Sequence, residues 1–396
     1  MHLLQGTVQH YAWGTTDAIP ALLGTEPDGT PNAEYWLGAH SQAPSRVGET
    51  TLDALIASDP AILGDKVRGT FGDDLPFLMK VLSARHALSI QAHPSREQAE
   101  AGFARENAAG IPQDAPERVY SDDWPKPEIL IALDEFETLS GFRDPVASAA
   151  LFSALGVSED LGSLLAPLTE RKGGAALAQV FLEVLSLEGN RAEVIDLVVA
   201  AAMRHASESG PVGDFARTAV ELDAVFPGDR GILAALLMNR VKLQPGEAVY
   251  VPAGHMHAHL KGTGIEVMAN SDNVIRGGLT PKHVDVRELV AVVGFDPAEP
   301  EVVRPDPVRP GVERYSVPCP EFGVWRVRPQ QSQEPVILPG RKSARIVFVV
   351  DGELTLRDGD STLSLSRGDA AFLGASETGV LASGDGLAFV SASGRR

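Results

Sequence analysis

The chain has 396 residues, of which 44% are hydrophobic and 22% charged, an ordinary globular composition that predicts two or three domains. Its 53 acidic and 34 basic residues give a net charge of -19, which argues against nucleic acid or an anionic membrane as the main partner. The single cysteine, Cys319, excludes an intramolecular disulfide framework. The start lacks a signal-peptide pattern and no apolar run approaches the roughly 18 residues of a membrane helix, so we expect a soluble, cytoplasmic protein.

The first part of the chain alternates strand-like and helical segments. Residues 1–50 are punctuated by glycine and proline, which is typical of strands and turns. Residues 51–64 carry apolar side chains at helical spacing, and two strand-like runs follow at 76–82 and 87–93. Good helix formers then predict a helix over 94–110.

The second part changes character twice. Strands are predicted over 126–142, and residues 145–227 are rich in Ala, Leu, Glu and Val with apolar positions recurring at three and four, which indicates a helical domain or insertion. From Val241 the pattern returns to strands, and the proline-rich segment 297–311 is typical of a linker. Strands and glycine turns alternate from residue 312 to the end, which predicts a separate small β-domain.

Two stretches carry side chains suited to a metal ion. Gln91 and His93 are two apart in a strand-like run, so both face one side of the strand. His255, His257 and His259 likewise share a face if their segment is extended. An isolated pair of this kind is more often a hydrogen-bonded core pair than a ligand set, so the argument depends on further partners.

Spacing supplies those partners. A glycine, five residues, Pro-x-Gly, two residues and a histidine form the cupin pattern, which is met by Gly246, Pro252, Gly254 and His257. Glu128 adds a carboxylate, so Gln91, His93, Glu128 and His257 make a nitrogen and oxygen ligand set suited to Zn²⁺ or another borderline divalent ion. Such a site can keep one position open to substrate, which makes it a catalytic candidate.

Longer segments resemble a known family. In the same order as in that family, the chain contains QHYAWG, NAEYWLGAH, LPFLMKVLSARHALSIQAHP, YSDDWPKPEILIALDEFETLSGF, FPGDRGILAALLMNRVKLQPGEAVYVPAG and EVMANSDNVIRGGLTPKHVDV. From near residue 6 to about residue 290, the chain resembles the type I phosphomannose isomerases.

This resemblance implies a zinc enzyme on a cupin scaffold, with one Zn²⁺ per chain, that interconverts mannose 6-phosphate and fructose 6-phosphate. The zinc ligands that it implies are Gln91, His93, Glu128 and His257. The other site residues that it implies are the catalytic Arg276, the phosphate contacts Ser89 and Lys282, and the pocket residues Lys80, Lys126 and Asp272.

The expected fold is mainly β with a helical insertion. A cupin (double-stranded β-helix, or jelly-roll) catalytic domain is expected from residues 1–144 and 228–300, with the helical insertion at 145–227. Residues 312–396 have the glycine that opens the second cupin motif, in SRGDAAFLGAS, but neither its proline nor its histidine. We therefore expect a degenerate, metal-free cupin-like β-domain there.

An aldose to ketose isomerisation moves a proton between C2 and C1 through an enediol-type species, so it needs a base. Glu266 is our first choice for the base, with Asp272 behind it. Arg276 stays cationic and can hold a developing oxyanion or order the substrate. We interpret Glu34 and His40, together with Trp13, as packing residues.

Two departures from the family pattern concern the base and the ligands. Several relatives have a histidine where this chain has Pro125, so a mechanism that uses that histidine cannot operate here. Many also read His-Ala-Tyr where this chain has His257-Ala-His259, and His255 is a further imidazole outside the pattern. His259 could replace the hydrogen bond of the tyrosine or compete for the metal.

Three other functions stay open at this point. The chain could be a zinc cupin isomerase of another phosphosugar, such as glucose 6-phosphate, or a non-catalytic sugar-binding cupin. A redox cupin is less consistent with the residues, because those sites usually have two histidines and one carboxylate around iron. The expected partner is a small phosphosugar, with neither nucleic acid nor membrane, and we expect a monomer without excluding an oligomer.

Overall fold

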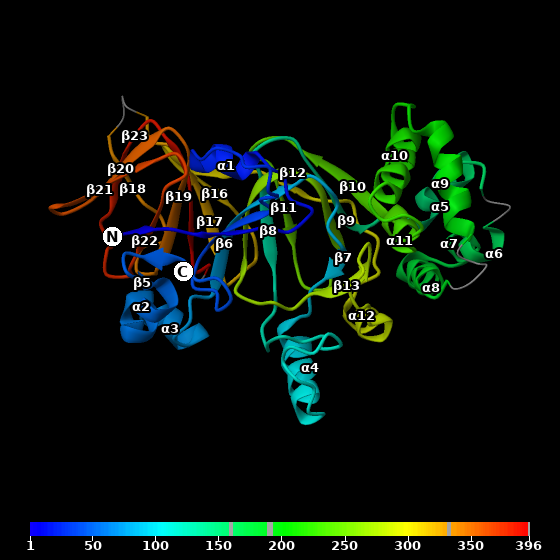
Figure 1. Ribbon diagram of the computed structural model, residues 1–396, viewed down its shortest axis with the longest axis horizontal. Coiled ribbons are helices and arrows are strands. Elements are labelled where there is room, and N and C mark those ends of the chain that lie inside the picture. Colours follow the sequence, from blue (N-terminus) through cyan, green and yellow to red (C-terminus); the bar gives the residue numbers. More distant parts are fainter. Residues whose placement is uncertain (158–160, 188–192, 331–333, 395–396) are drawn as a thin grey trace.

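The computed structural model describes residues 1–157, 161–187, 193–330 and 334–394. A central β region lies between a second β region, which holds both chain termini, and a group of helices at the opposite end (Figure 1). None of the helices in the described ranges has the length and apolar content needed to cross a bilayer.

The central region is an 11-stranded sheet with branches. Its strands are β2 (Thr7–Gln9), β3 (Glu34–Leu37), β6 (Phe77–Ala84), β7 (Ile90–Ala92), β8 (Glu128–Ala132), β9 (Phe136–Phe142), β10 (Met238–Leu243), β11 (Ala248–Val251), β12 (His257–Ala269), β13 (Ile275–Gly278) and β14 (Val302–Val303).

Strand β12 joins the two parts of this sheet. Its first half, from His257 to Lys261, pairs with β7 and β9, and its second half, from Gly262 onward, pairs with β6 and β8. Gly262 has a φ of 118°, and a Cβ there would lie 2.7 Å from the ring of Phe136. A glycine is therefore needed where the strand passes from one set of neighbours to the other.

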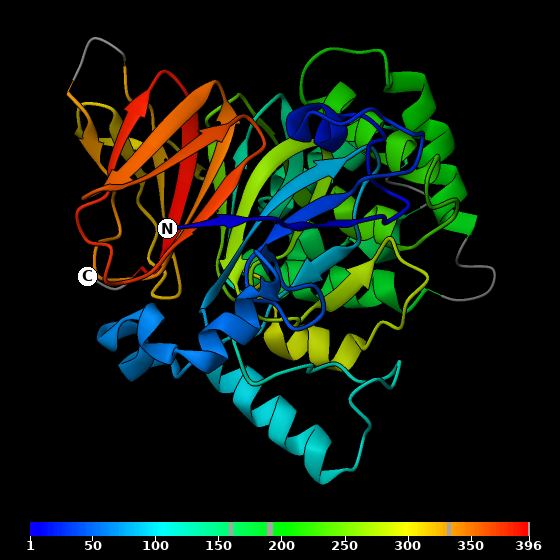
Figure 2. The same cartoon turned by 60° about the vertical axis from the view of Figure 1, so that its left-hand side comes forward.

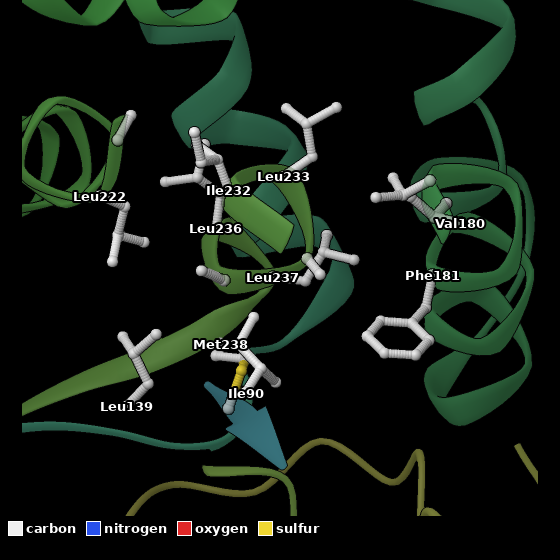
Figure 3. Packing of buried hydrophobic residues seen from close by; sticks show 14 of the residues in the cluster. Ile90, Leu139, Val180, Phe181, Leu222, Ile232, Leu233, Leu236, Leu237 and Met238 are labelled. Carbon is white, nitrogen blue, oxygen red and sulfur yellow. The ribbon is translucent and has the colours of Figure 1, made fainter. Parts of the chain in front are cut away.

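The helical group follows β9. Its helices are α5 (Pro145–Ala154), α6 (Gly162–Leu165), α7 (Pro167–Glu170), α8 (Gly173–Leu185), α9 (Glu193–His205), α10 (Pro211–Asp223) and α11 (Gly231–Leu236). Val180 and Phe181 of α8 and Ile232 of α11 pack in one buried cluster with Ile90 of β7 and Leu139 of β9 (Figure 3). The helices therefore share a core with the strands on which the site is built.

The second β region consists of two sheets. The seven-stranded sheet runs in the order β1 (His2–Leu4), β22 (Ala370–Leu373), β19 (Arg345–Asp351), β24 (Leu387–Ala392), β17 (Gly323–Val327), β16 (Val312–Tyr315) and β15 (Asp306–Arg309). The four-stranded sheet runs in the order β18 (Val336–Ile337), β23 (Leu381–Gly384), β20 (Glu353–Asp358) and β21 (Ser361–Ser366). The N-terminal strand β1 thus belongs to a sheet formed otherwise by residues after 305.

The remaining elements lie around these regions. They are α1 (Ala18–Leu23), the strands β4 (Arg46–Val47) and β5 (Thr50–Thr51), α2 (Leu52–Ser58), the 3-10 helix η1 (Pro60–Leu63), α3 (Asp65–Phe71), α4 (Arg96–Ala108) and α12 (Val286–Val292). The helix predicted after the strand-like run at 87–93 is confirmed as α4, which begins with a capping box formed by Ser95 and Gln98. This helix projects away from both β regions (Figure 2).

Candidate metal centre and substrate pocket

Three neighbouring strand ends bring the metal-like side chains together. His93 directly follows β7, Glu128 is the first residue of β8, and His257 is the first residue of β12. The nearest nitrogen-to-oxygen distances are 3.4 Å from His93 Nε2 to Glu128 Oε1 and 3.3 Å from His257 Nε2 to Glu128 Oε2. None of the three side chains is more than 3% exposed.

The hydrogen bonds of the two imidazoles fix where their protons lie. His93 Nδ1 is 2.7 Å from the carbonyl of Asn273, and His257 Nδ1 is 3.3 Å from the carbonyl of His255. Because a carbonyl only accepts, each Nδ1 carries the proton, and each Nε2 is left with a lone pair. Both Nε2 atoms are buried and have no hydrogen-bond partner among the described residues.

These lone pairs face the carboxylate oxygens of Glu128, an arrangement that is repulsive unless a cation lies between them. Burial lowers the pKa of His93 to about 4, so this imidazole is neutral at physiological pH. Neutral imidazoles and a carboxylate are the ligands that Zn²⁺ takes in catalytic sites. The residues therefore fit the ion implied by the sequence.

Gln91 lies beside this triad. It is the cross-strand partner of His257 on one side and of Arg276, in β13, on the other. It also shares a strand face with His93, two residues further on. Strand register thus places a predicted fourth ligand between a metal-like histidine and a predicted catalytic arginine.

A second group, formed by Glu128, His259 and Glu266, is less suited to a metal ion. The ammonium of Lys80 lies 3.3 Å from Glu266 and 3.5 Å from Glu34, so these carboxylates already have a buried cation. Although burial alone favours the neutral lysine, the two carboxylates outweigh it and hold the pKa of Lys80 above its usual range.

The charges of Glu266 and Glu128 are fixed in the same way. Burial alone would raise the pKa of Glu266, but the nearby Lys80 holds it below its ordinary value. For Glu128, the charge of Lys126 overcomes the burial and keeps the pKa well below the usual range, and the Lys126 ammonium donates directly to this carboxylate. Both carboxylates are therefore ionised at neutral pH.

The two histidines outside the family pattern have other partners. His255 Nε2 is 2.9 Å from the hydroxyl of Ser140. His259 Nδ1 is 3.1 Å from the hydroxyl of Thr138, and its Nε2 lies 3.6 Å from Glu266. Among the described residues, only His257 of these three faces Glu128 together with His93.

Beyond Gln91, the lining of a cavity of about 450 Å³ includes Arg118, Arg276, Lys282 and His283 and one acidic residue, Asp285. Arg276 is half-buried on one wall, and Lys282 stands at the exposed rim with His283. Burial lowers the pKa of Arg276, and the charge of Arg276 lowers that of Lys282. Across the described ranges, neither side chain has a hydrogen bond or an acidic partner, so the cavity is suited to an anion.

Two further predicted site residues, Ser89 and Asp272, are not among the residues that line this cavity. Ser89 is half-buried one residue before β7. Asp272 lies three residues after β12, and the charges of Lys126 and Lys80 both act on its carboxylate.

Two residues interpreted from sequence as packing residues contact other predicted site residues. Glu34 lies 3.5 Å from the ammonium of Lys80 and accepts a hydrogen bond from the indole of Trp36, and His40 lies 3.3 Å from Asp272. The spacing Glu34-x-Trp36 was a sequence signal of the contact between these two residues, because alternate residues of a strand place their side chains on one face.

Strands that carry two histidines and a glutamate at their ends, beside a pocket, define a metal-binding cupin. Residues 1–145 match the family profile for the catalytic domain of type I phosphomannose isomerase, and residues 323–393 match that for the mannose-6-phosphate isomerase cupin domain. The chain belongs to the type I mannose-6-phosphate isomerase family.

Relatives match along nearly the whole chain. The mannose-6-phosphate isomerase of Salmonella typhimurium is 41% identical over 98% of both chains, and that of Rattus norvegicus is 34% identical over 96% of this chain and 94% of its own. A crystal structure of mannose 6-phosphate isomerase bound with zinc and yttrium superposes with a TM-score of 0.89 at 37% identity over 99% of both chains. The expected fold class is thereby confirmed.

Proposed function

We propose that the chain is a zinc-dependent aldose–ketose isomerase that interconverts mannose 6-phosphate and fructose 6-phosphate. The observation that carries this proposal is the pair of buried imidazole lone pairs directed at Glu128, one strand away from an arginine without an acidic partner. The first feature is suited to a metal ion and the second to a phosphate. The relatives described above carry the names of enzymes with this activity.

In this proposal Gln91, His93, Glu128 and His257 hold one zinc ion. When bound, zinc acts as a Lewis acid that polarises the carbonyl oxygen of the open-chain sugar, which contributes several kcal/mol to the stabilisation of developing charge.

The phosphate enters the cationic cavity. Lys282 binds it there, with Ser89 as a further phosphate contact, and Arg276, at the boundary between the cavity and Gln91, orients the sugar and holds developing negative charge. A phosphate held at one end fixes the position of C1 and C2 at the other, and its binding energy can be used at the reacting carbons.

Glu266 takes the proton from C2 of the aldose and returns it to C1, while the hydroxyl proton of O2 passes to O1, so that the C2 hydroxyl becomes the carbonyl of the ketose. Its carboxylate is ionised because Lys80 lies 3.3 Å away, so it can accept a proton at neutral pH. Lys80 and Lys126 are buried ammonium groups with donors to offer to sugar oxygens, and Asp272 is an acceptor for sugar hydroxyls.

We further propose that residues 1–144 and 228–300 form the catalytic domain, 145–227 the helical insertion and 312–396 a metal-free domain. The enzyme is assigned to the cytoplasm as a monomer. The buried, unpaired Cys319 agrees with a reducing compartment. Sedimentation measures the oligomeric state directly, with 41.9 kDa expected for the monomer.

The test of this function compares substrates. Purified zinc-loaded protein is given mannose 6-phosphate or glucose 6-phosphate, and formation of fructose 6-phosphate is followed. We expect a higher kcat/KM for mannose 6-phosphate. Faster turnover of glucose 6-phosphate would favour an isomerase of another phosphosugar, and binding of both without turnover would favour a sugar-binding cupin.

A further inference from the structure

The carboxylate of Asp272 is held by a short loop that follows strand β3. His40 Nε2 lies 3.3 Å from Oδ1, and the side-chain amide of Gln42 donates to Oδ2 over 2.9 Å. His40 is 5% exposed, and its ring packs edge-on against Trp36, with ring centroids 4.8 Å apart. Both oxygens of Asp272 are thus held from a segment 230 residues earlier in the chain.

The loop also determines which nitrogen of His40 carries the proton. The backbone N–H of Gln42 points at His40 Nδ1 over 3.3 Å, so Nδ1 is an acceptor. A neutral imidazole with Nδ1 as acceptor has its proton on Nε2, the atom that faces Asp272. His40 therefore presents a donor to the carboxylate without needing a positive charge.

Other groups around Asp272 favour its ionised form. Burial raises the pKa of this carboxyl, but His40, Lys126 and Lys80 outweigh the burial and bring it below its ordinary value. On the other side, the backbone N–H of Asp272 donates to the carboxylate of Asp122 over 2.8 Å, and the two like charges oppose each other there. Burial, the charge of Glu34 and the charge of Asp272 together raise the pKa of Tyr11. A carboxylate with a low pKa and two fixed donors is a poor proton acceptor and a good hydrogen-bond acceptor.

We propose that His40 and Gln42 are positioning residues that hold the Asp272 carboxylate as a fixed acceptor for a hydroxyl group of the sugar substrate. This inference rests on the proposed phosphosugar isomerase function. It assigns Asp272 to substrate recognition and leaves proton transfer to Glu266. The geometry assigns this role to the Nε2–H of His40 and not to the packing of its ring.

Two isosteric substitutions separate these roles. In His40→Gln the side-chain amide nitrogen can take the place of Nε2 and still donate to Asp272. In His40→Asn the shorter amide can take the place of Nδ1, so it keeps the contact with the Gln42 backbone but cannot reach Asp272. If His40 only stabilises the loop, His40→Asn should be the more active variant. If His40 holds Asp272, His40→Gln should be the more active one.

The experiment measures kcat and KM for mannose 6-phosphate with both variants, in the wild-type and the Asp272→Ala backgrounds. We expect kcat/KM of His40→Asn to fall about 10- to 100-fold, as for the loss of a hydrogen bond to a charged group, and that of His40→Gln to be about tenfold higher than that of His40→Asn. In the Asp272→Ala background, which removes both acceptor oxygens, the two variants should differ by less than about twofold, because their common target is gone.

Gln42→Glu provides a second test at an exposed position, where a folding defect is not expected. It places a carboxylate against that of Asp272, so kcat/KM should fall about tenfold with wild-type Asp272 and change little with Asp272→Ala. Zinc content and Tm are measured for every variant.

Three results would overturn the inference: higher activity of His40→Asn than of His40→Gln, an equal loss from His40→Asn in both backgrounds, or an unchanged kcat/KM in Gln42→Glu. Absence of turnover in the zinc-loaded wild type would instead count against the proposed function, so the two failures are distinguishable.

Discussion

Among individual residues, the position of single protons governs the chemistry of the pocket. The carbonyls of Asn273 and His255 keep the Nδ1 protons in place, so His93 and His257 present bare nitrogens to a metal ion. Lys80 is the cross-strand partner of Glu266 and keeps this carboxylate ionised although it is buried. The tautomers of the two histidines and the ionised state of Glu266 thus each depend on one backbone or cross-strand neighbour.

Replacing His257 should therefore remove the metal. We expect His257→Ala to weaken zinc binding by more than the roughly 10- to 100-fold typical of losing an outer-shell partner, and to abolish turnover. His255→Ala is the matched control, because His255 contacts Ser140 and should retain zinc. Metal content after dialysis measures both, and loss of zinc from the control alone would place the ligand at position 255.

The assignment of the base makes a separate prediction. Glu266→Gln keeps the size of the side chain but cannot accept the proton, so kcat should fall about 10²- to 10⁴-fold with zinc still bound. Glu321→Gln is a control at an equally buried glutamate in the second β region. Near-full turnover of zinc-loaded Glu266→Gln would remove this residue as the base.

Among the elements, an ion-pair network joins the helical group to the central sheet. The guanidinium of Arg240, in β10, contacts Glu137 of β9 and both Thr218 and Glu221 of α10. Glu137 is buried and is also paired with Lys261. Removing Arg240 leaves this buried carboxylate with only the half-exposed Lys261 as a cationic partner among the described residues, so its charge is poorly compensated.

We expect Arg240→Met to lower the free energy of unfolding by about 3 kcal/mol, measured by urea denaturation at pH 7. Arg304→Met is the control, because the Arg304 side chain is 69% exposed and its pair with Glu247 should contribute less than about 1 kcal/mol. Equal effects of the two substitutions would contradict the prediction.

The pH dependence of this difference has a definite sign. Burial raises the pKa of Glu137, but the charge of Arg240 outweighs it and holds this pKa below its ordinary value. The pairing therefore stabilises the fold above the pKa that Glu137 has in the unfolded chain, and this stabilisation is lost as the pH falls through the lower pKa of the folded protein. The gap in stability between wild type and Arg240→Met should therefore narrow in acid.

At the scale of the whole molecule, the two β regions share one core. Phe77 and Val267 of the central sheet pack in the same buried cluster as Phe348, Phe372 and Phe389 of the second region. The N-terminal strand β1 also pairs with β22, near the other end of the chain. The second β region thus covers an apolar face of the central one.

Deleting residues 301–396 should therefore prevent stable folding. The deletion exposes a large apolar surface and leaves β1 without its neighbour, so we expect an aggregated product without cooperative unfolding, measured by size-exclusion chromatography and circular dichroism. A monodisperse truncated protein with zinc-dependent turnover would show that the two regions fold independently.

Local patterns predicted much of this organisation. The alternation of Gln91 and His93, the glycine and proline spacing before His257, and the helix after Ser95 are encoded within a few residues. Contacts between distant segments were not predictable in this way. Neither the pairing of β1 with β22 nor the contact of His40 with Asp272 has a local signal, because register between segments hundreds of residues apart depends on tertiary packing.

The central claim is that zinc on Gln91, His93, Glu128 and His257 is required for isomerisation. The most direct measurement is the rate of conversion of mannose 6-phosphate to fructose 6-phosphate by purified protein, before chelation, after chelation and after zinc is added back. We predict loss of turnover and its recovery at one zinc per chain. Undiminished turnover in protein shown to be free of metal would contradict the account.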